Sequence, residues 1–279
     1  GALGIDVEQI SLATPDTDSS PYNWGTTASR NTYMAGRAVV GAARSVVDQL
    51  KERAATMMEC APEDLEMRPG GFIGITGVPD AQVSYGDISG FSHWVAHGPV
   101  IGSDSLAFDG ENFDPKRGFI KGFPFGRIGA WIFAAQAVEI EIDEATGKIT
   151  PLEVWSAHDI GKAINPASVA GQVEGGVVQG IGFALYEEMV WDTGRLANPS
   201  LMDYKIAGTM DAPPNINTIL IEEPDEFGPF GAKGIGEPPI VGIAPAIANA
   251  LTHATGIRLK QLPMTPERVL NALQEKNEI

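Results

Sequence analysis

The stretch that decides the fold class reads "AVEIEIDEATGKITPLEVWSAHDIG" and covers residues 137–161. Apolar residues alternate with polar ones on both sides of a turn at residues 143–147, a pattern that predicts a β-hairpin. The next stretch, "NPASVAGQVEGGVVQGIGFALYEEMV" (residues 165–190), begins with Asn-Pro and continues at helical spacing, which predicts a helix. Because strands and helices interleave without a strict βαβ repeat, the sequence favours an α+β fold over a doubly wound sheet.

Similar patterns extend the prediction in both directions along the chain. They predict strands at residues 10–13 and 216–222, and helices from about Asn31, at 242–256 (ending at Gly256) and at 265–276 (capped by Thr265). Residues 76–130 are rich in Gly, Ser, Asp and Pro and have weak periodicity. We expect this part to be a loop-rich insertion with short helices, either a lid or a surface that faces a partner.

The composition restricts the class of protein. The chain has 279 residues, enough for one large domain or two ordinary ones, and its net charge of −17 argues against binding to nucleic acid. No apolar run approaches the length of a membrane span, and no signal peptide is recognisable. The single cysteine, Cys60, excludes a disulfide framework and an iron–sulfur cluster held by this chain alone, so we expect a reducing compartment, the cytoplasm. Because the first residue is Gly1 rather than Met, we expect the sequence to begin inside a longer protein or after processing.

A second stretch, "GPFGAKGIGEPP" (residues 228–239), can be neither a helix nor a strand. Four glycines and three prolines surround one lysine, Lys233, and one glutamate, Glu237. Glycine permits backbone conformations closed to other residues, and proline fixes φ and lacks an N–H donor. The segment is therefore expected to be stiff and irregular. Either it is an elaborate turn, or it holds Glu237 against something.

Other polar residues near predicted helix starts allow two interpretations each. The segment "YNWGTTASRN" (residues 22–31) is either a simple N-cap or a turn that binds an anion, a phosphate or a pterin. In the helix at 165–190, each glycine costs about 1 kcal/mol relative to alanine, which implies close packing against backbone or a bound group. Gln172 in that helix either bonds to a neighbouring loop or points its amide at a polar cofactor.

The histidines offer a weaker signal. In "HWVAH", His93 and His97 lie four residues apart and could share a zinc ion on one helix face, but ordinary loop histidines are the favoured interpretation. His158 and His253 stand alone in the sequence, and each is interpreted as a structural or surface group.

Taken together, these motifs resemble the xanthine oxidase family of molybdenum hydroxylases, and in particular the C-terminal half of their molybdopterin-binding subunit. The resemblance implies that residues 1–279 form one C-terminal molybdopterin-binding region with an insertion around 76–130. It implies an α+β fold of the molybdenum hydroxylase type, in which helices pack on mixed sheets. The segments that carry it are "PYNWGTTASRNTYMAGRAV" (21–39), "AHDIGKAINPASVAGQVEGGVVQGIGFALYEEM" (157–189), "NPSLMDYKI" (198–206), "GPFGAKGIGEPP" (228–239) and "LPMTPERVLNAL" (262–273).

The resemblance also assigns a role to the lone carboxylate. The family's G-x-G-E-P loop holds the catalytic glutamate beside molybdenum, and Glu237 occupies that position. It is implied to be the general base, which removes the proton from a hydroxyl group on the metal. Lys233 is expected to orient the loop or to contact the cofactor. No side chain is expected to bind the metal, because the pterin dithiolene does so. The implied cofactor contacts are Thr26, Thr27, Ala28, Ser29, Asn31, Asp159, Asn165, Gln172, Lys233 and Gly236.

The parts of the family's enzymes that this sequence lacks imply partners. We expect one subunit of a split complex, paired with a chain that carries the N-terminal half of the molybdenum-binding subunit. An iron–sulfur subunit with [2Fe–2S] clusters and an FAD subunit would remove the electrons, and the pterin would be the cytosine dinucleotide form. The implied reaction is oxidation of an aldehyde or an N-heteroaromatic compound with oxygen from water. The alternatives are a reductive enzyme acting on aromatic acyl-CoA, or a non-catalytic assembly subunit.

Overall fold

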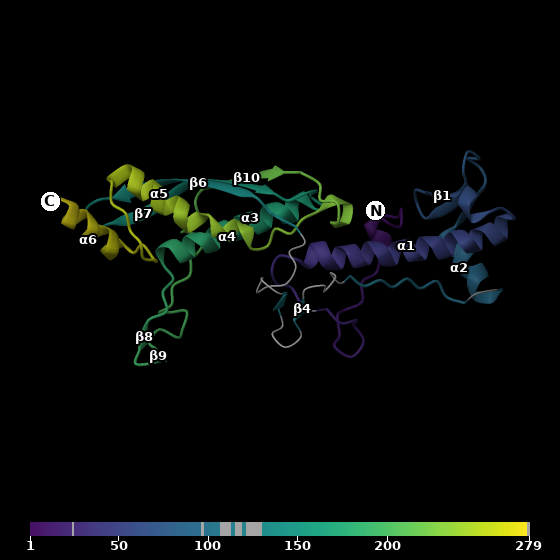
Figure 1. Ribbon diagram of the computed structural model, residues 1–279, viewed down its shortest axis with the longest axis horizontal. Coiled ribbons are helices and arrows are strands. Elements are labelled where there is room, and N and C mark those ends of the chain that lie inside the picture. The colour runs from purple at the N-terminus through teal and green to yellow at the C-terminus, as the bar shows by residue number, and fades with distance from the viewer. Residues whose placement is uncertain (24, 96–97, 107–112, 115–118, 121–129, 278–279) are drawn as a thin grey trace. The chain divides into compact units, whose positions relative to one another are not determined.

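The computed structural model describes residues 1–23, 25–95, 98–106, 113–114, 119–120 and 130–277 (Figure 1). The chain divides into two compact units. The first comprises Gly1–Gly25 and Tyr33–Pro124, and the second comprises Thr26–Thr32 and Phe125–Ile279. All of the predicted site residues belong to the second unit. The interpretation of residues 1–279 as one region stays a prediction.

The first unit contains most of the long helix α1 (Asn31–Met58), which begins where the sequence predicts. An antiparallel sheet follows, with strands β1 (Leu65–Arg68), β2 (Phe72–Ile75) and β3 (Gln82–Ser84), and then helix α2 (Tyr85–Trp94). A small core of Leu50, Ala54, Leu65, Ile73 and Ile88 joins α1 and α2 to the sheet. The remaining elements of this unit are η1 (Val7–Gln9), η2 (Pro62–Asp64), β4 (Phe113–Asp114) and β5 (Phe119–Ile120).

The strand predicted at residues 10–13 is wrong. The chain forms the 3-10 turn η1 just before it, because the Gln9 side chain accepts a hydrogen bond from the Asp6 backbone N–H at 3.0 Å. Residues 10–13 are exposed and pair with no strand in the described ranges. A short apolar run does not become a strand when no neighbouring backbone is present to bond with it. Within the predicted insertion at 76–130, α2 is one of the expected short helices.

The second unit is built on the predicted hairpin, which is confirmed. Strands β6 (Ala134–Asp143) and β7 (Lys148–Asp159) are antiparallel, and β10 (Asn215–Ile221) lies parallel to β7 on its other side. Gly147 closes the hairpin at φ +74°, and a Cβ there would lie 2.1 Å from the Pro266 carbonyl oxygen. Glycine is therefore required at this turn for its conformation and for the space it leaves.

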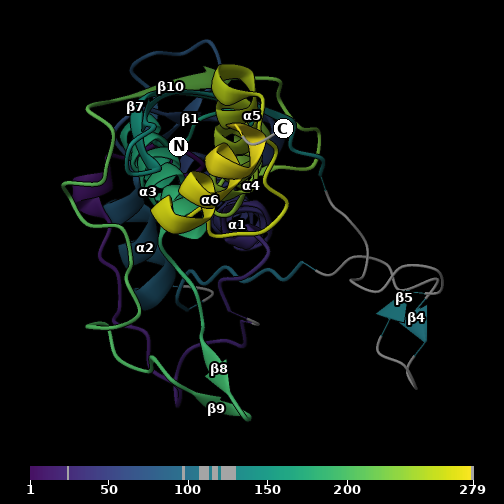
Figure 2. The same ribbon diagram turned by 90° about the vertical axis from the view of Figure 1, so that its left-hand side faces the viewer.

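Four helices pack on one face of this sheet (Figures 1 and 2): α3 (Pro166–Leu185), α4 (Pro238–Val241), α5 (Ile243–Thr255) and α6 (Pro266–Asn277). Helix α3 lies very close to the chain around α4. A Cβ at Gly176 would come within 2.5 Å of Pro239, and one at Gly180 within 2.7 Å of Ile243. Two of the costly glycines in α3 are thus explained by close packing. The α+β class, with helices on mixed sheets, is confirmed.

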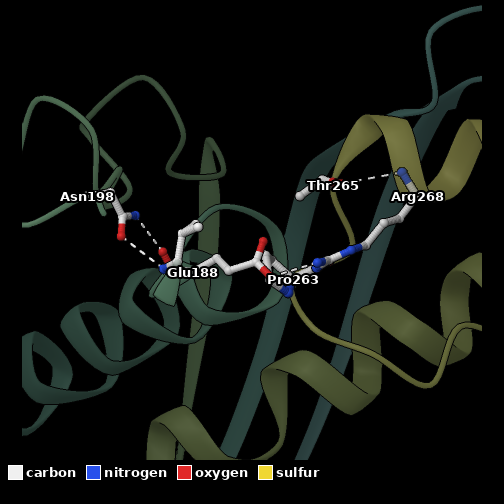
Figure 3. A network of polar contacts seen from close by, with 6 residues as sticks. Glu188, Asn198, Pro263, Thr265 and Arg268 are labelled. Atoms are coloured by element: carbon white, nitrogen blue, oxygen red, sulfur yellow. Dashed lines mark hydrogen bonds and ion pairs between the residues drawn. The ribbon is translucent and has the colours of Figure 1, made fainter. Parts of the chain in front are cut away.

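An extended arm leaves the C-terminus of α3 and carries the hairpin β8 (Trp191–Asp192) and β9 (Arg195–Leu196) (Figure 1). Helix α3 ends at Leu185, five residues before the predicted end. The Asn198 side chain accepts from the Val190 N–H at 2.9 Å and donates to the Glu188 carbonyl at 2.7 Å, which directs the chain outward (Figure 3).

The same close-up shows the start of α6, where the predicted Thr265 cap is present. The Thr265 hydroxyl accepts from the Arg268 N–H at 3.4 Å. Among the helices of the described ranges, none combines the length and apolar character needed to cross a bilayer.

Candidate active site

Ser29, in the segment at 21–39, and Glu237, in the segment at 228–239, are in direct contact. The Ser29 hydroxyl donates to Oε2 of Glu237 at 2.8 Å, and its oxygen accepts from the Glu237 backbone N–H at 2.8 Å. The two residues are 208 positions apart in the sequence. This reciprocal pair of hydrogen bonds fixes both the backbone and the carboxylate of Glu237. The segment at 228–239 therefore positions Glu237 and is more than a turn.

The local backbone explains why this contact needs a glycine-rich partner. Ala28 and Ser29 both have left-handed φ values, +52° and +51°, which are uncommon for residues with a side chain and mark a strained turn. A Cβ at Gly234 would lie 1.6 Å from the Ser29 carbonyl oxygen, so no other residue fits there without moving the turn. Gly236 is also close, since its Cβ would lie 3.4 Å from the Ser29 hydroxyl oxygen.

The other side of the loop is held by a buried ion pair. The Lys233 ammonium lies 2.6 Å from Oδ2 of Asp159, and the two side chains are only 10% and 11% exposed. The Lys233 N–H donates to the Ile160 carbonyl at 2.9 Å, and Gly161 and Ala232 form an antiparallel bridge. These contacts favour the loop-orienting interpretation of Lys233. That Lys233 and Asp159 contact a cofactor stays a prediction.

Two acidic residues that the motif analysis did not select support the same loop. Asp225 accepts from the N–H groups of Phe227 and Gly228, both at 2.9 Å. Glu222 accepts from the Lys162 ammonium at 2.6 Å and from the Ala163 N–H at 2.9 Å. The hydrogen bond from Lys162, followed by that from the Ala163 N–H, holds the pKa of Glu222 below its ordinary value. The acidic run "EEPDE" next to the Gly/Pro segment was the available signal.

Residues of α3 lie on the open side of the loop. The Gln172 side chain is exposed, and its Oε1 is 3.8 Å from the position of a Cβ at Gly236. Gln172 is thus not buried, and its hydrogen bond to a neighbouring loop and its contact with a cofactor both stay predictions. Asn165 caps α3 by accepting from the Ser168 N–H at 3.1 Å. A pocket of about 220 Å³ lies between α3 and the loop, with Asn165, Gln172 and Lys233 in its wall.

The structure thus brings together Ser29, Gln172, Gly236 and Glu237, four of the predicted residues. Thr26, Thr27, Ala28 and Asn31 lie in the same turn and are exposed. Glu237 is exposed as well, so the described residues of this chain do not shield its carboxylate from water.

The favoured interpretation of His93 and His97 as loop histidines is wrong for His93, which lies in a helix. His93 lies in α2, where its ring meets the Trp94 ring edge-on with centroids 4.6 Å apart. His97 lies outside the described residues. Across the described ranges, no three His, Cys, Asp or Glu side chains gather as a metal-ligand set.

The fold is similar to that of an enzyme of known structure. Quinoline 2-oxidoreductase from Pseudomonas putida 86 has a chain that is similar, with a TM-score of 0.82 at 26% identity. The match covers 98% of this chain and 34% of that one.

Two curated relatives agree with this. The nicotine 6-hydroxylase large subunit of Paenarthrobacter nicotinovorans is 34% identical over 274 residues, which are 97% of this chain and 32% of the relative. The xanthine dehydrogenase molybdenum-binding subunit of Escherichia coli O157:H7 is 31% identical over 272 residues, which are 96% of this chain and 34% of the relative. The chain spans about a third of the length of these relatives.

Residues 1–213 match the model of the molybdopterin cofactor-binding domain, and the chain belongs to this family. The resemblance to the molybdenum-binding subunits of the xanthine oxidase family is confirmed. Glu237 lies beyond the matched residues, so its role depends on the geometry described above.

Proposed function

We propose that this chain forms the molybdopterin-binding part of an enzyme that oxidises a small aldehyde or N-heteroaromatic compound, with Glu237 as general base. The observation that carries the proposal is the reciprocal hydrogen bonding between Ser29 and Glu237. The names of the relatives support the substrate class, because nicotine and quinoline are N-heteroaromatic compounds. This chain matches only about a third of the length of the nicotine 6-hydroxylase large subunit, which supports the proposal that sequence outside these 279 residues supplies the remainder of the site.

The residues present fit a pterin cofactor. Gly236 leaves open the space between the Ser29 hydroxyl and the Gln172 amide, which a larger side chain would occupy. Thr26 and Thr27 are exposed in the same turn, so a polar ligand would meet their hydrogen-bonding groups as well as the Glu237 carboxylate. Ser29, Gln172 and Gly236 would hold its edge. When bound, the molybdenum cofactor would supply the two-electron oxidation and the site at which oxygen from water is delivered.

The chain's own residues would prepare the base. The Ser29 hydroxyl donates to Oε2 of Glu237. Oε1 has no hydrogen-bond partner among the described residues, so Oε1 is available to take a proton. The hydrogen bond from the Glu237 N–H to Ser29 fixes the direction of the carboxylate. The Lys233–Asp159 ion pair holds the same segment four residues earlier. A base held within reach of its proton in this way satisfies the geometric requirement for general base catalysis.

The direct test is Glu237→Gln in the complete enzyme, which keeps the shape of the side chain and removes the base. We expect turnover to fall by about 10²–10⁴-fold while molybdenum and pterin content stay unchanged. Glu223→Gln, at a nearby exposed position, is the matched control and should retain full turnover. Full turnover in Glu237→Gln with cofactor bound would eliminate the base assignment.

Cofactor and partner analysis tests the wider proposal. We propose the cytosine dinucleotide form of the pterin, [2Fe–2S] and FAD subunits, a chain with the N-terminal half of the molybdenum-binding subunit, and a cytoplasmic location. Mass spectrometry of the released pterin identifies its form, and mass spectrometry of co-purifying chains identifies the subunits. Iron, flavin and cell-fractionation analyses test the clusters, the FAD and the location. A purified complex without molybdenum would favour the non-catalytic assembly alternative, and turnover only with aromatic acyl-CoA would favour the reductive one.

A further inference from the structure

A row of polar side chains crosses the helix-covered face of the sheet in the second unit. Gln136 of β6, Ser156 of β7 and Thr218 of β10 are neighbours in the strand register, and His158 follows two positions along β7. Ser156 and His158 are fully buried. The adjacent row on the same face, Val138, Val154 and Ile216, is part of the apolar core. Polar groups in such a layer need a reason, because they cost stability unless they are fully hydrogen-bonded.

Hydrogen bonds connect this row to the segment that follows Glu237. The Gln136 amide nitrogen donates to the Pro239 carbonyl at 2.8 Å and to the Ser156 hydroxyl oxygen at 2.8 Å. Because the Pro239 carbonyl can only accept, the orientation of the Gln136 amide is fixed. The Ser156 hydroxyl oxygen lies 2.8 Å from Nε2 of His158, so these two groups share a hydrogen bond.

Burial supports the neutral form of the histidine, since it lowers the pKa of His158 from its ordinary value. The row also has atoms without hydrogen-bond partners among the described residues, namely Nδ1 of His158, Oε1 of Gln136 and Oγ1 of Thr218. An apolar row would fill this layer without such groups. Stability alone therefore does not explain why this row is polar.

The far end of the row is attached to the catalytic segment. Pro239 is buried two residues after Glu237, and Glu237 is the N-cap of the short helix α4. Gly176 of α3 packs against the Pro239 ring, and the Gln136 amide donates a hydrogen bond to the Pro239 carbonyl. Gly242, just after α4, also lies against Gln136, since a Cβ there would be 2.2 Å from Oε1. The turn that follows Glu237 is thus fixed from the sheet as well as from α3.

We propose that His158, Ser156 and Gln136 are positioning residues, which form a hydrogen-bonded row that holds Pro238 and Pro239 and so aims the Glu237 carboxylate. The catalytic consequence depends on the function proposed above, whereas the structural consequence does not. Ser29 holds the Glu237 carboxylate directly, and the row holds the backbone on which it stands.

The experiment uses the complete enzyme and begins with Gln136→Met, which keeps the length of the side chain and removes both donated bonds. Hydrogen exchange, followed by mass spectrometry, measures the N–H groups of Glu237 and Ile240, which donate to Ser29 and to the Glu237 carbonyl. We expect exchange there to accelerate about tenfold, because the turn opens more often. Ile142→Val, on the same face of β6, is the control for a general loss of packing and should leave these N–H groups unchanged.

A pair of histidine variants separates positioning from simple burial. His158→Gln can place a hydrogen-bonding amide group where Nε2 lies, whereas His158→Asn reaches only the position of Nδ1. We expect kcat to fall about tenfold in His158→Asn and in Gln136→Met, with KM and molybdenum content unchanged, and to stay near the original value in His158→Gln.

The proposal is overturned if exchange at Glu237 and Ile240 in Gln136→Met equals that in Ile142→Val, or if the two histidine variants behave alike. If Glu237→Gln is fully active but exchange still accelerates in Gln136→Met, the row holds the turn and only the base assignment fails. If no variant turns over, exchange in His158→Gln against His158→Asn decides the question by itself.

Discussion

Two glutamates in the second unit are held in opposite ways. Glu188, at the base of the arm, lies 2.6 Å from the Arg268 guanidinium, which also donates to the Pro263 carbonyl at 2.8 Å (Figure 3). Glu237, at the end of the Gly/Pro segment, is held by a neutral hydroxyl and by its own backbone N–H. The first carboxylate has a fixed cation as its partner and joins two elements. The second has a fixed direction but no cation partner among the residues that the structure describes, which suits a group that must gain and lose a proton.

The sharpest way to break this comparison is to neutralise each glutamate in turn. Glu237→Gln should lower turnover by about 10²–10⁴-fold and leave the free energy of unfolding nearly unchanged. Glu188→Gln should retain most turnover and lower the free energy of unfolding by about 1 kcal/mol, the usual scale for a charged hydrogen bond at a partly exposed site. Steady-state kinetics and urea denaturation of both variants measure this, and a similar loss of turnover in both would remove the distinction.

The backbone contact beneath Glu237 provides the next test. In Gly234→Ala, the new methyl group would lie 1.6 Å from the Ser29 carbonyl, so the turn must move away from the loop. We expect a stability loss of about 2–3 kcal/mol together with weaker cofactor retention. Gly90→Ala in α2 meets no atom within 4 Å and should be neutral or stabilising by up to about 1 kcal/mol. Thermal unfolding and molybdenum content distinguish them, and normal values in Gly234→Ala would contradict the close approach.

The contact between Arg268 and Glu188 at the base of the arm provides a third test. Arg268→Met removes the ion pair with Glu188 and the bond to the Pro263 carbonyl, so we expect a loss of about 1–2 kcal/mol and faster proteolysis of the arm. Arg258→Met, an exposed position on the segment after α5, is the matched control. If limited proteolysis cuts the arm equally fast in both variants, the network in Figure 3 does not hold it.

The smallest expected effect concerns pH. Because the Lys162 ammonium and the Ala163 N–H lower the pKa of Glu222 in the folded chain, this residue stabilises the fold above the ordinary pKa of glutamate. The contribution is lost as the pH falls through the lowered pKa. The stability difference between the original chain and Glu222→Gln should therefore be present at neutral pH and shrink in acid. A difference that grows as the pH falls would have the wrong sign.

Local chemistry made much of the fold predictable. The alternation over residues 137–161 predicted the hairpin, and Asn165 and Thr265 marked helix starts that the structure confirms. The helix from Asn31 and the C-terminal cap at Gly256, with φ +75°, were equally local. The failures came from contacts outside the segments themselves. Residues 10–13 had the composition of a strand but pair with no strand in the described ranges, and the chain after α3 is held by Asn198, thirteen positions beyond Leu185.

The sequence by itself predicted a stiff and irregular segment at residues 228–239, because proline fixes φ and glycine permits conformations closed to other residues. The structure corrects this in part, since the segment contains the 3-10 helix η3 (Pro229–Gly231) and the first residues of α4. The sequence also supplied the family motifs in their order. Only the tertiary structure decided that Ser29 meets Glu237 across 208 residues, and that Gln136, Ser156 and His158 connect the sheet to Pro239. Contacts of this kind depend on strand register and on how closely helices pack, and neither is encoded in any short segment of the chain.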